Sequence, residues 1–368
     1  MINSIQLLRA CAASSVVFYH SGYQINGVNT DFQGVSIFFV ISGFIMTYIS
    51  NTSPEYFFAR RVIRIVPLYW MITFLYILTT NLGLTNPLYI FPVLKDWATR
   101  DPMQILNWIS SQNGITNNEN ISNIIKSLLF IPYVNSSGNV HPVLGVGWSL
   151  NLEMYFYLIF SIFIIFNSKI APLFVFFTIL IIKFIIQYFN PENGLIIYSN
   201  NYIFYFDAGI FLYYIYNYYS NNQIKLKYIN KLIIILSPVI ISIFICSNIG
   251  IFKSSGDGEP LNLTDIILWS NPILIFCLTL FVDKYIKYDN IKNILLLGNA
   301  SYALYLSHPI IVETSRTIGD KIIAANPKDN ISALIILIAI CVLFSIFIFK
   351  FIERPIIGWF KSRLFAEK

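Results

Sequence analysis

Long apolar runs separated by short polar breaks dominate this chain. Ten of the runs are long enough to cross a bilayer, which takes about 20 residues of helix. They cover residues 5–22, 32–50, 63–83, 147–167, 171–189, 201–219, 232–250, 264–282, 294–314 and 332–351. The pattern predicts an all-α polytopic membrane protein, a bundle of about ten transmembrane helices.

Composition agrees with that pattern. Of 368 residues, 56% are hydrophobic and 11% are charged, whereas soluble domains carry roughly a quarter charged residues. The mean hydropathy is +0.66. These values exclude an ordinary water-soluble globule. The first run has no small-residue cleavage site after a short apolar core, so we expect it to be retained as the first span.

Lysine and arginine between the spans predict the orientation, because cytoplasmic loops carry an excess of positive charge. With the N-terminus inside, the inner loops and tail hold fifteen of the 24 Lys and Arg residues, and the outer loops hold seven. Arg9 and Lys183 fall within spans. We therefore expect both termini in the cytoplasm. Topology accounts for the net charge of +6, so the lipid bilayer and not nucleic acid is the expected partner.

The longest polar interruption runs over residues 84–145 and contains the turn-rich stretch "NGITNNENISN". In the predicted orientation it is extracytoplasmic, and it is the one loop large enough to form a cap. We expect a single membrane-embedded domain over residues 1–368, since no period of 20–50 residues repeats.

Arg9 and His20 are the basic residues of the first span. Eleven positions at ~100° each place both on one helical face, roughly 16 Å apart. Ionisable groups inside a bilayer are costly and by default mark a functional path, and histidine suits proton transfer near neutral pH. The alternative is that Arg9 reaches back to the inner surface while His20 lies at the outer interface.

Three arginines, Arg60, Arg61 and Arg64, begin the third span in "FFARRVIRIVPLYW". Arg60 and Arg64 are four residues apart and share a face, so they could bind phosphate oxygens with paired hydrogen bonds. Positive-inside anchoring explains the charge but not the clustering. The cluster is thus a candidate site for a cytosolic phosphate-bearing ligand, with anchoring as the alternative.

The segment "HPVLGVGWSLNLEMYFYL" places Glu153 about two turns from the predicted outer mouth, near Trp148, Ser149 and Asn151. A carboxylate among apolar residues needs a partner. His20 ends the first span at the same predicted level, so we expect a His20–Glu153 pair of the kind used in general-base catalysis. The role of His141 stays open.

The segment "GNASYALYLSHPII" spaces Ser301, Tyr305 and His308 four and three residues apart, on one face that would point into the bundle. Pro309 frees the carbonyl of Tyr305. The alternative is a kinked helix whose polar stripe seals contacts between helices.

Other polar residues within or beside the spans have less defined roles. Glu353 and Pro355, in "FIERPIIGWF", are expected to end the last helix. Asp207 and Lys183 are buried charges that could pair with each other. The four cysteines fall within apolar spans and show no metal-ligand spacing, so no metal site is expected.

Taken in order, the motifs resemble the acyltransferase-3 family of integral membrane O-acyltransferases, over essentially the whole chain. The matching elements are Arg9 with His20, "FFVISGFIM", the arginines with "RIVPLY", "GWSLNLEMYFY", "SYALYLSHP", and Glu353 with Pro355. The segment from His141 in particular resembles members that acetylate bacterial exopolysaccharide and O-antigen sugars. Some relatives carry a C-terminal SGNH hydrolase-like domain, which we do not expect here.

The resemblance implies an enzyme of the bacterial cytoplasmic (inner) membrane. It would move an acetyl group from cytosolic acetyl-CoA to a sugar hydroxyl of a surface polysaccharide or lipid-linked oligosaccharide, without a metal. It implies that His20 is the catalytic base and that Glu153 belongs to the same site. It associates the acyl-CoA with the arginine cluster Arg60, Arg61 and Arg64, to which we add Arg9 from its position. The residues expected along the substrate path are Trp148, Asn151, Ser301, Tyr305 and His308.

Two other classes of membrane protein fit the spans. A small-molecule transporter would show matching broken helices in two halves, and no such symmetry is visible. A polysaccharide export or polymerisation component would want a basic outer loop, whereas residues 84–145 hold only Lys95, Arg100 and Lys126.

Overall fold

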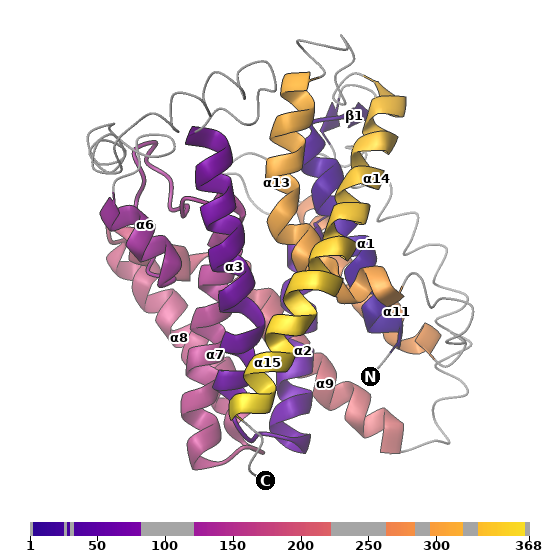
Figure 1. The fold of residues 1–368 in the computed structure, drawn as a ribbon. Helices are drawn as coiled ribbons and strands as arrows, with labels where there is room; N and C mark the ends of the chain where they lie inside the picture. The colour runs from indigo at the N-terminus through magenta and orange to yellow at the C-terminus, as the bar shows by residue number, and fades with distance from the viewer. Residues whose placement is uncertain are drawn as a thin grey trace.

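A computed structural model describes residues 3–25, 28–29, 33–81, 121–221, 263–283, 295–318 and 330–364 (Figure 1). In these residues the fold is helical, as predicted. The main helices are α1 (Asn3–Ser21), α2 (Gly34–Thr52), α3 (Phe57–Asn81), α6 (Ile121–Leu128), α7 (Trp148–Phe166), α8 (Ala171–Phe189), α9 (Ile203–Asn221), α11 (Leu263–Val282), α13 (Ser301–Ile318), α14 (Ile331–Ile348) and α15 (Arg354–Leu364). A two-residue antiparallel pair, β1 (Gln24–Ile25) with β2 (Val28–Asn29), lies between α1 and α2.

Several described helices are long and apolar enough to cross a membrane. Within the described ranges there are five, at Gly34–Thr52, Phe57–Thr79, Gly145–Phe166, Ala171–Phe189 and Ile331–Leu364, with a shorter apolar helix at Trp269–Val282. The protein is therefore a multi-pass helical membrane protein. The predicted span 232–250 and most of the loop 84–145 lie outside the described residues, so the count of ten and the orientation stay predictions.

The outer surface of the bundle is apolar where a bilayer would cover it. Large side chains on α7, α8 and α14 are strongly exposed, among them Phe166 at 80%, Tyr188 at 84% and Leu343 at 68%. Exposed apolar surface on this scale is typical of a face that contacts lipid.

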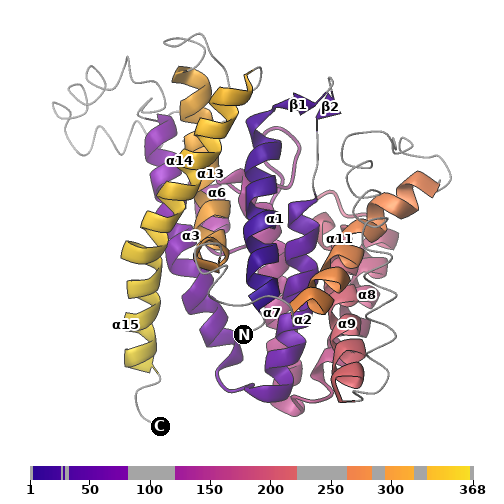
Figure 2. The ribbon, with the colours of Figure 1, turned by 90° about the vertical axis from the view of Figure 1, so that its right-hand side faces the viewer.

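Helix α1 lies at the centre of the bundle, in contact with α2, α11, α13 and α14 (Figure 2). It is less apolar than its neighbours, because a central helix need not face lipid. Ala10, Ala12 and Ala13 on it are buried, and small side chains let neighbouring helices approach closely. This position places Arg9 and His20 inside the protein and not at its edge.

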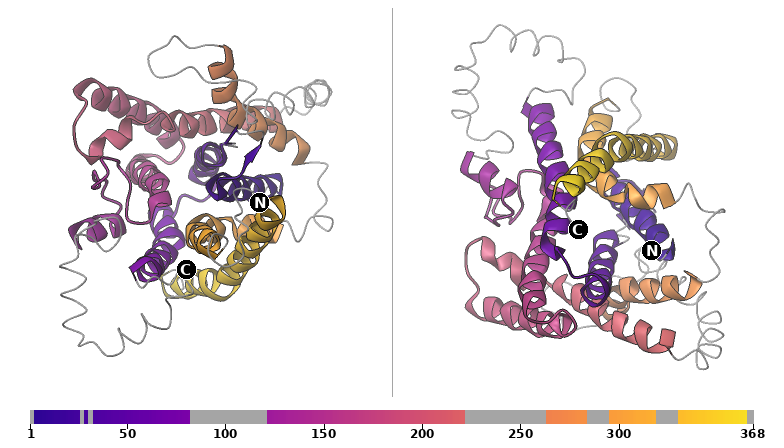
Figure 3. Two further views of the ribbon diagram at one scale, coloured as in Figure 1. Left: turned by 90° about the horizontal axis from the view of Figure 1, so that it is seen from above. Right: turned by 60° about the horizontal axis from the view of Figure 1, so that its bottom comes forward.

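Helix α2 connects α1 to the second half of the bundle, since it also contacts α7 and α9 (Figure 3). Gly43 on α2 and Gly209 on α9 let the two backbones touch. A Cβ added at Gly43 would lie 2.1 Å from the Phe206 carbonyl oxygen, and one at Gly209 would lie 2.2 Å from that of Val40. Either substitution would force the helices apart.

The expectation that Glu353 and Pro355 end the last helix is wrong. After α14 the chain makes one π-helical turn, Phe349–Glu353, and continues directly into α15 at Arg354. Proline is tolerated in the first turn of a helix, because its missing N–H would have no helical partner there. The wider π turn places Glu353 inside the protein, 4% exposed.

Candidate active site

Three cavities follow one another through the bundle. One cavity, of about 660 Å³, lies between the start of α3, α1 and the π turn, and another, of about 640 Å³, lies at the end of α1. We name them the inner and the outer cavity after the predicted orientation. A central cavity of about 80 Å³ lies between them and would hold on the order of five waters. Arg9, Arg61 and Arg64 line both the inner and the central cavity, and Tyr305 lines both the central and the outer one.

The inner cavity is strongly cationic. Five basic and two acidic side chains line it, and these are Arg9, Arg60, Arg61, Arg64, Lys361, Asp283 and Glu353. The arginines converge because Arg60, Arg61 and Arg64 occupy one side of the first turns of α3, opposite α1. A concave site with an excess of positive charge attracts anions. The predicted arginine cluster thus forms a single site that also includes Arg9.

Two charged groups in this region have atoms without a hydrogen-bond partner. They are the Nε of Arg61 and the Oε2 of Glu353, and both are buried and unpartnered within the part of the chain described. Buried polar atoms nearly always have a partner in native proteins, so each needs an explanation. A polar ligand in the inner and central cavities would supply one.

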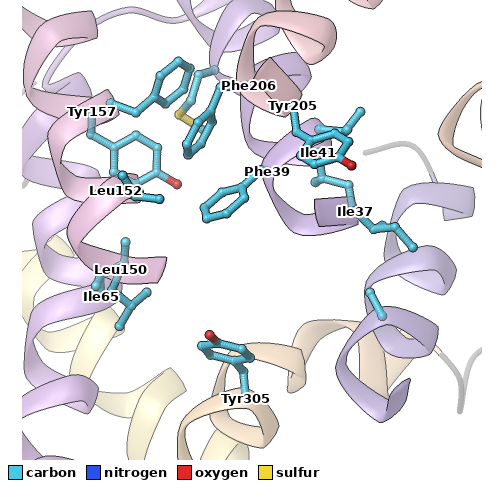
Figure 4. Close-up of a cluster of buried hydrophobic side chains, with 14 of the residues drawn as sticks. Ile37, Phe39, Ile41, Ile65, Leu150, Leu152, Tyr157, Tyr205, Phe206 and Tyr305 are labelled. Carbon is cyan, nitrogen blue, oxygen red and sulfur yellow. The ribbon is translucent and has the colours of Figure 1, made fainter. Parts of the chain in front are cut away.

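Glu153 lies in the central cavity and not at the outer mouth. Its carboxylate accepts hydrogen bonds from Ser42 Oγ on α2, at 2.9 Å, and from Tyr157 on its own helix. Figure 4 shows the Tyr157 ring pointing its hydroxyl toward the space between α2, α7 and α13, with Tyr305 facing it from the opposite side. Arg9, Arg61 and Arg64 line the same cavity, so Glu153 belongs to the arginine region.

The predicted pair between His20 and Glu153 is therefore wrong. The two side chains line different cavities, and no hydrogen bond or ion pair between them occurs in the described structure. The prediction estimated the depth of Glu153 by counting residues from the expected start of its span. The 3-10 turn at Gly145–Gly147, just before α7, is already buried, so Glu153 lies deeper in the bundle than that count suggested.

Tyr305 connects the two halves of the site. Its hydroxyl donates to the Val146 carbonyl oxygen at 2.8 Å and lies 2.7 Å from Ser149 Oγ. These bonds hold α13 against the start of α7 at the boundary between the central and outer cavities. One turn earlier, Ser301 is fully buried and lines the central cavity, and its Oγ has no partner among the described residues.

The outer cavity is lined by aromatic rings and neutral polar groups. The Trp148 ring lies 5.1 Å from Tyr202 and 6.4 Å from His141, measured between centroids. His20 and Tyr19 also line it, with Ser199 and Asn200 across from them. Desolvation lowers the pKa of His141 below its usual 6.5, so this ring is neutral at pH 7.

His20 contacts α13 through both its ring and its backbone. Its Nδ1 lies 3.2 Å from Nε2 of His308 and 3.0 Å from the Val16 carbonyl oxygen. Its own carbonyl oxygen accepts a hydrogen bond from Arg316. Arg316 follows the predicted span 294–314 and is one of the seven basic residues assigned to outer loops. The sequence gave no signal of its contact with His20, because the two residues are 296 positions apart.

Other predicted residues lie elsewhere than expected. Asn151 is 3% exposed and its Oδ1 has no partner in the described residues, but it does not line these three cavities. The proposed pair of Lys183 with Asp207 is wrong. Lys183 donates to the Ser199 carbonyl and to Asn201, at 2.9 Å for the latter, while neither carboxylate oxygen of Asp207 has a partner within the described ranges.

Some site residues were absent from the prediction. Tyr157 follows Glu153 by four residues on the same helical face, and this spacing could have identified it. Ser42 is on a different helix, and Tyr302, which lines the central cavity and donates to the Ile65 carbonyl at 2.8 Å, looks like an ordinary aromatic residue in the sequence. Among the described residues no three His, Cys, Asp or Glu side chains gather as metal ligands.

Comparison with known proteins identifies relatives of the whole chain. A family model for acyltransferase-3, described as "Acyltransferase domain", matches residues 2–350. The "Exopolysaccharide production protein ExoZ" of Rhizobium meliloti (strain 1021) is 27% identical over 336 residues, which is 90% of each chain.

A second relative matches over a shorter region. The "Putative peptidoglycan O-acetyltransferase YrhL" of Bacillus subtilis (strain 168) is 27% identical over 166 residues, 43% of this chain and 23% of that protein. No solved structure matches the chain significantly.

Proposed function

The chain belongs to the acyltransferase-3 family and is an O-acyltransferase, and from that premise we propose that it moves an acetyl group from acetyl-CoA to a sugar hydroxyl of a bacterial surface polysaccharide. The acyl donor enters from the cytosol into the inner cavity. The acceptor, part of an exopolysaccharide, O-antigen or capsule, enters the outer cavity from the other side of the inner membrane. The name of one relative refers to exopolysaccharide production and that of the other to O-acetylation of peptidoglycan, and both support a glycan acceptor.

The observation that carries this proposal is the succession of three cavities that share lining residues. Coenzyme A is a polyanion with a long neutral arm ending in a thioester. Its phosphates fit the excess positive charge of the inner cavity, where guanidinium groups can bind phosphate oxygens in pairs. The narrow central cavity, lined by Arg9, Arg61 and Arg64, suits the thin pantetheine arm.

Length supports the same arrangement. Arg9 and His20 are eleven residues apart on α1, about 16 Å along the axis. The pantetheine arm is comparable to about five extended residues, on the order of 15–20 Å. Phosphates held near Arg9 therefore bring the thioester to the level of His20.

The outer cavity suits a sugar. Trp148, Tyr202 and Tyr305 offer ring faces and a hydroxyl, and Ser199 and Asn200 offer neutral polar groups. Sugars have apolar ring faces and many hydroxyls, so aromatic and neutral polar side chains match them better than charged ones. The volume of about 640 Å³ is within the range of small-ligand pockets, which is enough for one or two sugar units.

The proposed chemistry is a direct transfer. The imidazole of His20 removes the proton from an acceptor hydroxyl, whose oxygen attacks the thioester carbonyl. The C–S bond then breaks, the acetyl ester is formed, and the thiolate of coenzyme A takes up the proton from His20. The alternative is an acetyl-histidine intermediate, in which the ring nitrogen attacks first and the sugar hydroxyl attacks second.

The test uses cells that lack the gene, complemented with wild type or His20→Ala at matched membrane levels. We expect O-acetyl signals in the proton NMR spectrum of the surface polysaccharide with wild type and none with the variant. In isolated membranes, wild type should transfer label from radiolabelled acetyl-CoA to de-O-acetylated polysaccharide.

Two outcomes would contradict the proposal. Absence of acetyl groups with wild type would point to another acyl group or to a transport function. Equal acetylation with both proteins would mean that His20 is an interfacial residue without a role in the transfer. A matched control is Ser161→Ala, which changes a hydroxyl on the exposed side of α7 that donates only to the Leu158 carbonyl.

A further inference from the structure

Helix α13 holds His20 at two points. The ring of His308 meets the ring of His20, with 4.9 Å between centroids, and Arg316 binds the carbonyl oxygen of His20 two turns further along. This carbonyl is in the last turn of α1, where carbonyls have no partner within the helix. The two helices also meet through apolar residues such as Ala13 and Leu304.

The hydrogen bonds that join the two rings to each other and to the carbonyls of their own helices allow one consistent assignment of the Nδ1 protons. His308 Nδ1 lies 3.2 Å from the Leu304 carbonyl oxygen, and His20 Nδ1 lies 3.0 Å from the Val16 carbonyl oxygen. A carbonyl oxygen only accepts, so both Nδ1 atoms must carry hydrogen. Nε2 of a neutral His308 then has a lone pair, 3.2 Å from His20 Nδ1, and shares the Nδ1–H of His20 with the Val16 carbonyl oxygen.

The opposite assignment fails. If His308 Nε2 donated to His20 Nδ1, then two nitrogen lone pairs would face the carbonyl oxygens of Val16 and Leu304. A protonated His308 would put a positive charge on a fully buried ring. The neutral Nδ1–H form of both rings satisfies all three contacts.

We propose that His308 is a positioning residue that, together with the Val16 carbonyl oxygen, holds His20 as the Nδ1–H tautomer, so that Nε2 of His20 is the basic nitrogen. This inference rests on the proposed role of His20 as the base. His308 was expected along the substrate path, but it is 0% exposed and is not among the residues lining the three cavities, whereas His20 lines the outer one. His308 therefore acts through His20 and not on a substrate.

The surroundings of His308 make it rigid enough for this task. Tyr305, one turn earlier, is bonded to Val146 and Ser149 and prevents rotation of α13. The bond from His308 to Leu304 fixes the plane of its ring. When Nε2 of His20 takes a proton, the ring becomes cationic, and its Nδ1–H bond to His308 becomes a stronger, charge-assisted bond.

The first experiment reads the tautomers without any turnover. The chain has three histidines, so protein labelled with 15N-histidine and reconstituted in lipid gives three pairs of ring signals, and His141→Gln identifies one pair. We expect protonated Nδ1 and unprotonated Nε2 for both His20 and His308 at neutral pH. In His308→Leu the Nδ1–H of His20 keeps only the Val16 carbonyl as acceptor, so part of the His20 signal should shift toward the Nε2–H form. A His20 ring already in that form in wild type would overturn the proposal.

The second experiment measures transfer from acetyl-CoA to de-O-acetylated polysaccharide. His308→Leu fills the same space without an acceptor, and we expect kcat to fall about 10- to 100-fold while both KM values stay within about twofold. His308→Gln places a side-chain oxygen near the position of Nε2, and it should recover much of the loss. Ser307→Ala, which removes a buried hydroxyl bonded to the Ala303 carbonyl on the same helix, is the matched control.

The outcomes separate the two proposals. Unchanged kcat in His308→Leu would reject the positioning role and leave the acetyltransferase intact. Equal losses in His308→Leu and His308→Gln would mean that His308 serves packing alone. If wild type shows the expected tautomers but transfers no acetyl group, then the proposed function fails and the hydrogen-bond assignment stands.

Discussion

The two ends of α1 present opposite kinds of polar environment. Near His20 the Arg316 guanidinium donates to a backbone carbonyl oxygen, and both ring nitrogens of His308 have partners. Near Arg9 the groups are charged, and buried atoms of Arg61 and Glu353 have no partner in the described structure. The outer end is already organised, whereas the inner end has the features of a site completed by a ligand.

The difference follows from the two tasks. A buried polar atom without a partner costs roughly 1–3 kcal/mol, so it persists only where something else compensates. A base must be held in one orientation before the substrate arrives, because the reaction depends on its geometry. A binding site for a polyanion must instead keep donors available for the incoming phosphates. The comparison predicts that substitutions of the inner arginines change the KM for acetyl-CoA and that substitutions of the residues that hold His20 change kcat.

The largest effect is expected from Arg61→Gln combined with Arg64→Gln. Both side chains line the inner and central cavities, and each charge-assisted bond to phosphate contributes about 1.5–3 kcal/mol. The KM for acetyl-CoA should rise about 100-fold or more, with a much smaller change in kcat, in steady-state assays of reconstituted protein. Lys169→Gln removes an exposed positive charge outside the cavities and should leave KM unchanged. A fall in kcat at constant KM for acetyl-CoA in the double variant would contradict the assignment of substrate binding to the Arg9 end of α1 and of catalysis to the His20 end.

Arg316→Gln tests the backbone contact at the outer end. Removal of the charged donor leaves the His20 carbonyl with a weaker partner, so α1 can rotate slightly at its end. We expect kcat to fall about 3- to 10-fold with unchanged KM for acetyl-CoA. The control is Arg363→Gln on α15, an exposed arginine whose guanidinium lies over Trp359. A change in the KM for acetyl-CoA in Arg316→Gln would mean that Arg316, like the inner arginines, contributes to binding acetyl-CoA.

Tyr157→Phe examines the boundary between the two ends. It removes one donor to Glu153 in the central cavity and leaves Ser42 as the other. A hydrogen bond to a charged group contributes about 1.5–3 kcal/mol, so the apparent Tm in detergent should fall by about 3–6 °C. Tyr188→Phe, at a residue that is 84% exposed, is the control. An unchanged Tm in Tyr157→Phe would mean that this hydrogen bond contributes little to stability.

The smallest effect is expected from His141→Ala. His141 lines the outer cavity, and desolvation keeps its pKa below the usual 6.5, so it is neutral above that pH and carries no charge to lose. We expect less than about a threefold rise in the acceptor KM, because one neutral contact contributes about 0.5 kcal/mol. The pH dependence of kcat between pH 6.5 and 8 should match that of wild type. A profile that moves in this range would assign His141 a part in proton transfer.

The chain's helical membrane class was predictable from the sequence, because it depends on local properties. Apolar runs of about 20 residues have few alternatives to a membrane helix, and the described helices coincide with the predicted spans to within several residues, as at α8 with residues 171–189. The grouping of Arg60, Arg61 and Arg64 was also local, since a helix fixes which residues share its face.

The partners of these residues were not predictable, because they are on other helices. The sequence favoured a pair between His20 and Glu153 from their expected depth in the membrane. In the structure α13 packs against α1, so that His20 contacts His308, and α2 approaches α7, so that Ser42 donates a hydrogen bond to Glu153. Pro355 looked like a helix end, yet one π turn carries the helix past it and turns Glu353 inward.

The sequence by itself therefore determined that the chain forms membrane helices and which helices carry arginine, histidine and glutamate at what spacing. These properties follow from the hydrophobic effect and helix geometry acting over about 20 residues. Tertiary structure alone decided which polar groups meet, because contacts such as the one between His20 and His308, 288 residues apart, depend on how helices rotate and pack. In a bundle that rotation is set by close backbone approaches, as at Gly43 and Gly209, and by bonds such as that of Tyr305 to Val146.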